Sequence, residues 1–177
     1  MNRTAQRAAL IAARRAISAS QRKLWDQQIA SQVVTWCKEN AIRTAGVYSP
    51  IQAEPCLSEV FPLLNDMGVQ LALPSITDKD QALTFSRWQP GEELMKDRYG
   101  VLVPLSTAKI VHPEVLFVPC VGFTPQGYRL GYGGGFYDRT LAQKPKPKAI
   151  GIAYRISLCT MTPGEHDIAL DCMITDY

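Results

Sequence analysis

The chain has 177 residues, of which 46% are hydrophobic and 20% are charged. These shares are typical of a globular protein and exclude a disordered or fibrous one, so we expect a single domain over residues 1–177. The formal net charge of +3 is too small to indicate the clustered basic stripe of a nucleic-acid-binding protein. No segment approaches the roughly 18 apolar residues of a membrane span. The sequence therefore predicts a cytoplasmic monomer without a nucleic-acid or membrane partner.

Two dense basic stretches, Arg14-Arg15 and Lys144–Lys148, are expected to be solvated. The 5 cysteines are scattered and include no CxxC pair, which argues against both a disulfide framework and a zinc site.

Two helices are expected at the start of the chain. Residues 1–16 are rich in Ala and Arg, and Ser18–Gln21 then has the pattern of a capping box. The helix that follows carries an apolar stripe on one face, formed by Trp25, Ile29, Val33 and Trp36.

Short apolar or alternating runs predict strands that alternate with helices. The expected strands are 45–48, 69–73 (closed by Pro74), 83–88, 115–118 and 149–154. A helix is expected between Pro55 and Gly68, because these residues favour a helix start and a helix end. Two or three of the strands are apolar on both faces. This pattern predicts an α/β fold with an open, largely parallel sheet flanked by helices, in a Rossmann-like three-layer arrangement.

Ligands of such sheets bind in the crevice beyond the carboxyl ends of the strands. Four segments are expected at those ends: Tyr48–Pro50, Pro74–Ser75, Pro119–Cys120 and Tyr154.

The segment Arg129–Arg139, with the sequence RLGYGGGFYDR, carries the strongest chemical signal. Four glycines in five positions remove the Cβ atoms that would keep a ligand away from the backbone, and they permit positive φ angles. Consecutive N–H groups can then converge on an anion, beside a helix that is expected to begin near Gly135. The two arginines suit phosphate oxygens, and Asp138 offers a hard oxygen ligand for Mg²⁺. The segment therefore predicts phosphate binding.

This loop matches neither of the two common phosphate-binding fingerprints. The pattern GxxxxGK[ST] fails because Lys and Ser/Thr do not follow the glycines, and GxGxxG fails because Phe136 takes the last glycine position. A flexible hinge or a tight turn from strand to helix would explain one or two glycines. It does not explain a run bracketed by arginines, aromatics and an aspartate, so anion binding is favoured and the hinge is the alternative.

The chain resembles a known enzyme family in six segments that occur in order. Residues 118–139 resemble the signature of 5-formyltetrahydrofolate cyclo-ligase, also called methenyltetrahydrofolate synthetase. The other segments that resemble motifs of this family are Arg3–Arg7, Tyr48–Glu54, Leu83–Trp88, Gly151–Tyr154 and His166–Asp167. One glycine loop alone would be a weak signal, whereas six ordered segments over nearly the whole chain are specific.

The resemblance implies an ATP-driven ring closure. From 5-formyltetrahydrofolate, with or without further glutamates, and MgATP, the reaction would give 5,10-methenyltetrahydrofolate, ADP and phosphate. The formyl oxygen would attack the γ-phosphate before N10 closes on the formyl carbon. Such a reaction needs positioning and charge stabilisation and no protein nucleophile. ATP as co-substrate and Mg²⁺ are the cofactors expected.

The resemblance also implies roles for individual residues. Arg129 is the expected catalytic residue, which stabilises the γ-phosphoryl group. The residues expected to bind ATP are Arg3, Arg7, Arg129, Leu130, Gly131, Tyr132, Gly133, Gly134, Gly135, Phe136 and Tyr137. Those expected to bind the folate are Ser49, Glu54, Trp88, Tyr132, Gly133, Gly134, Gly135 and Phe136. Asp138 and Asp167 are expected to hold Mg²⁺.

Three positions depart from the usual pattern of the family. Thr124 stands where the family usually has Asp, Ser157 where Gln is common, and Val103 where Glu is often found. These departures support one alternative, a non-catalytic protein that binds folate or nucleotide on the same scaffold. A different ATP-using ligase on this scaffold is a further alternative.

Overall fold

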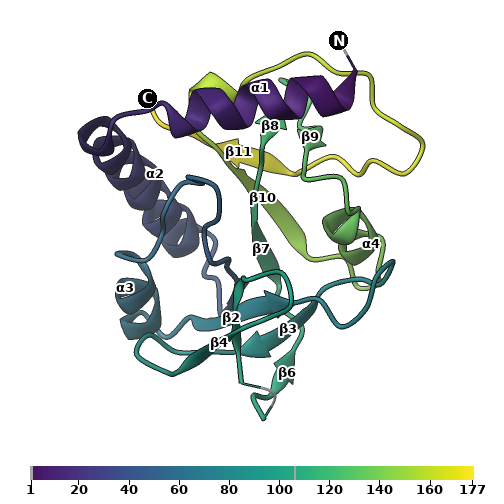
Figure 1. The fold of residues 1–177 in the computed structure, drawn as a ribbon. Coiled ribbons are helices and arrows are strands. Elements are labelled where there is room, and N and C mark those ends of the chain that lie inside the picture. The colour runs from purple at the N-terminus through teal and green to yellow at the C-terminus, as the bar shows by residue number, and fades with distance from the viewer. Residues whose placement is uncertain (1, 106) are drawn as a thin grey trace.

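The computed structural model describes residues 2–105 and 107–177 and shows an α/β fold built on a mixed sheet (Figure 1). The strand order is β11–β10–β7–β1–β2–β3–β6. Strands β11 to β2 run parallel, and β3 is antiparallel to both of its neighbours. The bounds are β1 (Thr44–Gly46), β2 (Gln70–Ser75), β3 (Thr84–Arg87), β6 (Ile110–Val111), β7 (Val115–Pro119), β10 (Lys148–Ile152) and β11 (Cys172–Ile174). The predicted open, largely parallel sheet flanked by helices is confirmed.

Helices cover both faces of this sheet. On one face lie α2 (Ala19–Glu39) and α3 (Phe61–Asp66), and on the other lies α4 (Phe136–Leu141) (Figure 1). Successive side chains of a strand point to opposite faces. In β7, therefore, Val115 and Phe117 pack on the α2 side, while Leu116 and Val118 pack on the α4 side. A strand buried on both faces reads as a continuous apolar run, which is why β7 could be predicted.

Helix α1 (Arg3–Arg15) crosses the carboxyl ends of the parallel strands, next to a small hairpin of β8 (Gly122–Phe123) and β9 (Arg129–Leu130) (Figure 1). A second hairpin, β4 (Leu94–Lys96) and β5 (Leu102–Pro104), contacts β2 through β5. A 3₁₀ turn, η1 (Arg155–Ser157), contacts α1. None of the helices within the described residues has both the length and the apolarity needed to cross a membrane.

The start of α2 and its apolar face agree with the sequence. The Ser18 hydroxyl accepts a hydrogen bond of 3.2 Å from the N–H of Gln21, as an N-cap should. Ile29 and Val33 are fully buried, and Trp25 and Trp36 pack against the same core. The amphipathic prediction for this helix is confirmed.

Two proline predictions are wrong. Pro55 does not begin a helix: α3 begins at Phe61, with Pro62 in its first turn, although Gly68 follows its end at φ 82° as expected. Pro74 does not close β2 but lies inside it, opposite Phe85 of β3. Strand β1 pairs with β2 only as far as Ala72, so β1 does not lie beside Pro74. The N–H group that proline lacks is therefore not needed for a hydrogen bond to β1.

Candidate active site

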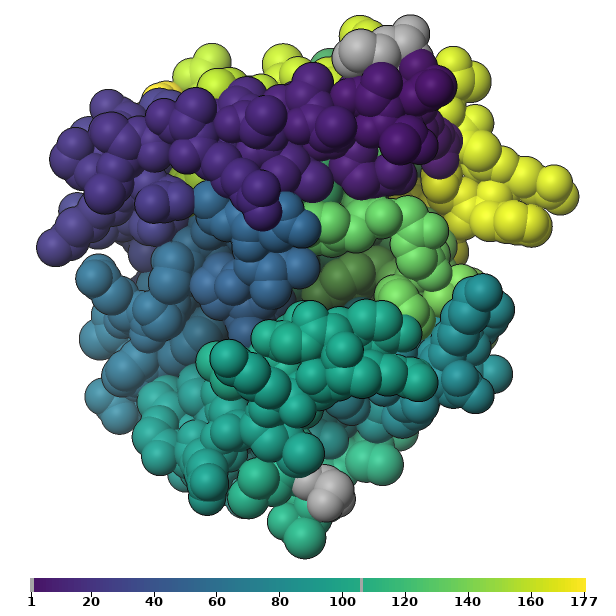
Figure 2. Space-filling model, in the orientation of Figure 1, coloured from purple at the N-terminus to yellow at the C-terminus, as the bar shows by residue number. Residues whose placement is uncertain are grey.

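A cavity of about 280 Å³ opens beyond the carboxyl ends of β1, β2 and β7, below α1. Figure 2 shows it as a hollow between α1, in purple, and the teal segment that contains the β4–β5 hairpin. Nearly all the residues predicted to bind a ligand line this cavity. They are Arg3, Arg7, Ser49, Glu54, Arg129, Leu130, Gly131, Tyr132, Gly133, Gly134, Gly135, Phe136, Tyr137, Asp138 and Asp167.

Trp88 is the one predicted site residue that does not line this cavity. It lines a neighbouring cavity of about 540 Å³, where its ring meets Phe61 edge-on at 5.7 Å. The two cavities share Tyr48, Ser49, Ile51, Val101 and Leu102. The Ser49 hydroxyl donates a hydrogen bond of 3.1 Å to the Leu102 carbonyl, so this contact forms part of the wall between them.

The glycine loop between β9 and α4 presents unused backbone donors. Among the described residues, no protein acceptor takes a hydrogen bond from any N–H group of Gly131–Gly135. Gly133 and Gly135 have φ angles of 97° and 67°, which residues with a Cβ rarely adopt. The Arg7 Nε donates to the Gly131 carbonyl at 2.7 Å and anchors α1 to the loop. A run of free N–H groups beside arginines is suited to an anion.

We expect alanine to be tolerated at one glycine of this loop and not at two others. An alanine at position 133 or 135 would have to adopt the positive φ angle of the glycine that it replaces, and its Cβ at position 135 would lie 2.8 Å from Arg139 Nη1. At position 131 the Cβ would meet nothing within 4 Å. G133A and G135A should each lower the free energy of unfolding by about 1–2 kcal/mol, and G131A should change it by less than about 0.5 kcal/mol. Urea denaturation measures this, and equal losses in all three variants would contradict the backbone conformation described.

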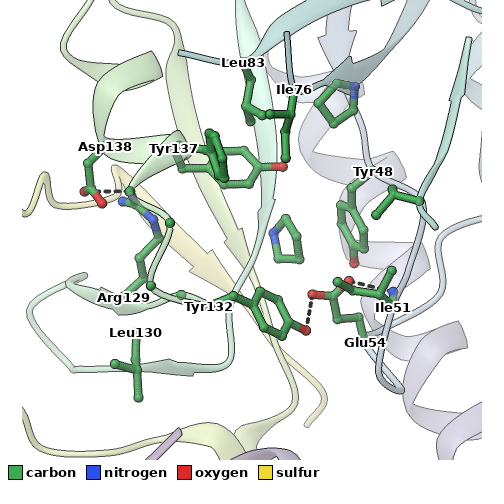
Figure 3. Close-up of a pocket in the computed structure, with 18 of the residues that line it drawn as sticks. Tyr48, Ile51, Glu54, Ile76, Leu83, Arg129, Leu130, Tyr132, Tyr137 and Asp138 are labelled. Atoms are coloured by element: carbon green, nitrogen blue, oxygen red, sulfur yellow. Dashed lines mark hydrogen bonds and ion pairs between the residues drawn. The ribbon is translucent and has the colours of Figure 1, made fainter. Parts of the chain in front are cut away.

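Arg129 is held rigidly at the edge of the cavity (Figure 3). Its side chain is buried, its Nη2 lies 2.6 Å from Asp138 Oδ1, and its Nη1 donates to the Ile168 carbonyl at 2.9 Å. Asp138 also accepts a hydrogen bond of 3.1 Å from the N–H of Ile168. The guanidinium is therefore held by an ion pair to a carboxylate and a hydrogen bond to a carbonyl.

A second ion pair joins α1 to the loop before β11. Arg3 Nη2 lies 2.5 Å from Asp167 Oδ2, which also accepts a hydrogen bond of 2.7 Å from the N–H of Gly164. Burial alone would raise the pKa of Asp167. Hydrogen bonds from Arg3 and Gly164, with the charges of Arg3 and Arg129, outweigh burial and lower that pKa. Asp167 is therefore ionised at neutral pH.

Asp138 and Asp167 fit the donor set that Mg²⁺ uses in nucleotide sites. Within residues 2–105 and 107–177, no group of three or more His, Cys, Asp or Glu side chains could form an all-protein metal cage. Mg²⁺ does not need one, because it is usually bound by one or two carboxylates together with waters and substrate phosphates. Each of the two carboxylates is held by one arginine, and both line the cavity.

Glu54 is a buried carboxylate on the opposite wall (Figure 3). Its Oε1 accepts a hydrogen bond of 2.8 Å from the Tyr132 hydroxyl, and its Oε2 accepts one of 2.9 Å from the N–H of Ile51. Burial raises the pKa of Glu54, and these two hydrogen bonds and the charge of Arg14 offset part of the rise. Gln52 and Ala53, just before it, have φ angles of 49° and 60°, so the loop is strained where it presents the carboxylate.

Two residues expected at the ligand edge face elsewhere. Arg139 does not line the cavity: its Nε donates to the Gln81 carbonyl at 3.0 Å and its Nη2 to the Gly134 carbonyl at 2.6 Å. Tyr154 packs against Trp25, and its hydroxyl donates to Asp26 at 2.6 Å. Both side chains therefore support the scaffold behind the site.

Arg14 was missed, and the prediction that it is solvated is wrong. Its side chain is 1% exposed and donates three hydrogen bonds, whereas Arg15 is exposed as expected. The spacing from Arg7 to Arg14 is seven residues, which places both on one helix face. That periodicity was the available signal.

The comparison with protein families gives a match over residues 1–176 to the 5-formyltetrahydrofolate cyclo-ligase family. The chain belongs to that family. A 5-formyltetrahydrofolate cyclo-ligase of Escherichia coli K12 is 31% identical over 170 residues, which cover 92% of this chain and 93% of the relative. The resemblance predicted from the sequence is confirmed, and so is the expectation of an enzyme, a cyclo-ligase.

Two solved structures of the same kind share the fold. The 5,10-methenyltetrahydrofolate synthetase of Mycoplasma pneumoniae has a TM-score of 0.81 at 26% identity, covering 98% of each chain. That of Aquifex aeolicus has a TM-score of 0.84 at 26% identity, covering 99% of this chain and 90% of the other.

The three departures from the usual cyclo-ligase pattern lie away from the cavity lining in the described part of the chain. The Thr124 hydroxyl accepts a hydrogen bond of 3.2 Å from the N–H of Tyr128 and so closes the turn between β8 and β9. Ser157 and Val103 are both buried. The departures therefore alter supporting structure rather than the walls of the cavity.

Proposed function

We propose that this cyclo-ligase converts 5-formyltetrahydrofolate and MgATP to 5,10-methenyltetrahydrofolate, ADP and phosphate. The observation that carries the proposal is the pairing of two unlike ends in one cavity. At one end lie free N–H groups and Arg129, which suit phosphate, and at the other lies the buried carboxylate of Glu54, which suits a ligand with N–H donors.

The phosphate end would bind the triphosphate through the N–H groups of Gly131–Gly135, with the charges of Arg3 and Arg7 from α1. Arg129 would stabilise the charge that develops on the transferring γ-phosphoryl group. Because Asp138 and Ile168 already fix its guanidinium, no reorganisation is needed when that charge appears. Asp138 and Asp167 would hold Mg²⁺, which neutralises phosphate charge when bound.

The folate end would recognise the pterin. Each oxygen of Glu54 already accepts one protein hydrogen bond and keeps acceptor capacity for another. Two parallel N–H donors on the amino-pyrimidinone edge of the pterin fit that arrangement. The segment Tyr132–Phe136 would then meet the ring between the two ends. Trp88, together with Ser49, would contact the aminobenzoyl part in the neighbouring cavity, which shares a wall with the first.

The chemistry needs no protein nucleophile. The formyl oxygen forms a bond to the γ-phosphorus while the bond from that phosphorus to the ADP oxygen breaks. N10 then bonds to the formyl carbon and loses its proton. The bond from carbon to the phosphorylated oxygen breaks, phosphate departs with that oxygen, and the methenyl product remains. The protein contributes alignment of formyl oxygen and γ-phosphate and stabilisation of charge.

An absorbance assay tests the proposal. Purified protein with 5-formyltetrahydrofolate and MgATP should produce the methenyl-folate absorbance, and ADP should appear in equal amount. Omitting ATP, or replacing it with ADP, should abolish the signal. Binding of 5-formyltetrahydrofolate by calorimetry without ADP release would overturn the proposal and favour a non-catalytic binder.

A further inference from the structure

Arg14 is a fully buried arginine that does not touch the cavity. Its side chain is 1% exposed and lies outside the cavity lining. Within residues 2–105 and 107–177, no carboxylate lies within 4.0 Å of it. A buried charge without a direct partner is costly, so its surroundings should show what the charge does.

The guanidinium of Arg14 ties together three segments that form walls of the cavity. Its Nε donates to the Gln52 carbonyl at 3.0 Å, in the strained loop that carries Glu54. Its Nη1 donates to the Cys120 carbonyl at 3.2 Å, just after β7. Its Nη2 donates to the Tyr132 hydroxyl at 2.7 Å, in the glycine loop. One side chain of α1 therefore sets the spacing of both loops from the sheet.

The Tyr132 hydroxyl links Arg14 to Glu54. It accepts from Arg14 and donates to Glu54 Oε1 at 2.8 Å, so a single oxygen separates the two buried charges. A bidentate ion pair with an arginine would use lone pairs of both carboxylate oxygens. The relay uses only one, and leaves the carboxylate open toward the cavity (Figure 3).

We propose that Arg14 is a positioning residue, which holds Glu54 in place through Tyr132 and keeps this buried carboxylate ionised so that it can accept hydrogen bonds from a ligand. The inference deepens the folate-recognition role proposed above and rests on that role only for the identity of the ligand.

The other titratable groups that face Glu54 are neutral. Four such groups interact with its charge: Tyr48 just after β1, Cys120 just after β7, Tyr132 in the glycine loop and Tyr137 in α4. Burial raises the pKa of each of the four, so none is ionised near neutral pH. Arg14 is the cation whose charge acts on Glu54.

The protonation of Glu54 can be measured without any folate. Carbon-13 NMR follows the side-chain carboxyl carbon of Glu54 against pH, assigned by the signal that E54Q loses. R14Q should move the titration midpoint upward by about one pH unit or more, because an opposite charge nearby favours the ionised carboxylate. R14K should restore part of that shift. R15Q is the matched control, since Arg15 is exposed and its Nη2 donates to the Gln52 side chain, and it should leave the midpoint unchanged.

A second variant covers the case in which R14Q does not fold. Y132F keeps Arg14 but removes the linking hydroxyl, and Tyr132 is 38% exposed, so the fold should survive. Its midpoint should also rise, and adding R14Q to Y132F should shift it less than R14Q alone. Unchanged midpoints in R14Q and Y132F would overturn the inference.

Ligand binding separates this inference from the proposed function. The acidic limb of 5-formyltetrahydrofolate binding should move to higher pH in R14Q in step with the NMR midpoint. A wild-type protein that titrates as expected but forms no methenyl-folate would overturn the proposed function alone. Turnover in R14Q with the wild-type pH profile would overturn the role of Arg14 alone.

Discussion

Replacement of Arg129 by Met is expected to lower kcat by about 10³-fold while the KM for 5-formyltetrahydrofolate changes little. Removing one preorganised donor to developing charge costs about 10²–10³ in kcat, and arginines at transferring phosphoryl groups reach higher values. Arg129 is preorganised in this way, because Asp138 and the Ile168 carbonyl fix its guanidinium. Steady-state kinetics of methenyl-folate formation measures the effect.

The stability of R129M has to be measured alongside its kinetics. The variant leaves Asp138 without its partner, and breaking such a pair should cost about 2–3 kcal/mol, since the Asp138 side chain retains 25% exposure. R129K should fold better and recover part of kcat, although it cannot make both contacts of the guanidinium fork.

Arg139 offers the matched control for this experiment. It flanks the same glycine loop and carries the same charge, but its donors go to the Gln81 and Gly134 carbonyls. R139M should therefore lower kcat by less than about 10-fold, through loosening of the loop. Equal losses in R129M and R139M would show that net charge near the loop matters, and that Arg129 has no specific part in phosphoryl transfer.

The parts of the fold that could be predicted from sequence are those with a local pattern. Strand β7 is buried on both faces, so its apolar run identified it, and the stripe from Trp25 to Trp36 identified α2. The β8–β9 hairpin could not be predicted, because each of its strands is only two residues long and has no measurable period. Pro74 was wrongly predicted to end β2, because whether a strand tolerates a proline depends on where the neighbouring strand, here β1, stops pairing.

For the site, residue type and motif order located the cavity lining, but they could not give the direction of each side chain. Arg129 and Arg139 bracket the glycine loop in sequence, yet of the two only Arg129 lines the cavity. Trp88 belongs to a neighbouring cavity. Arg14 was predicted to be solvated like Arg15, because its burial depends on three segments that are distant in sequence. Such contacts arise only from the tertiary fold.

Replacement of Glu54 by Gln is expected to raise the Kd for 5-formyltetrahydrofolate by about 100-fold and leave ATP binding unchanged. The amide keeps the shape of the side chain but loses the charge and one acceptor, and hydrogen bonds to charged groups are worth about 1.5–3 kcal/mol. Calorimetry with each ligand separately measures the two affinities. E59Q is the control, since Glu59 is exposed and belongs to the same connection. Equal weakening of ATP binding in E54Q would place Glu54 outside the folate end.

Glu54 should also leave a signature in the pH dependence of stability. Burial raises the pKa of Glu54 in the folded protein, so the folded state holds its proton more tightly than the unfolded chain does. The stability that this proton contributes is fully present below the usual carboxyl range and is lost as pH rises through the raised pKa. Denaturant unfolding of the wild type should therefore show a decline over that interval which E54Q lacks. If the stability of the wild type and of E54Q depended on pH in the same way, ionisation of the Glu54 carboxylate would not destabilise the folded protein. The loss of ligand binding in acid would then have to come from another titratable group.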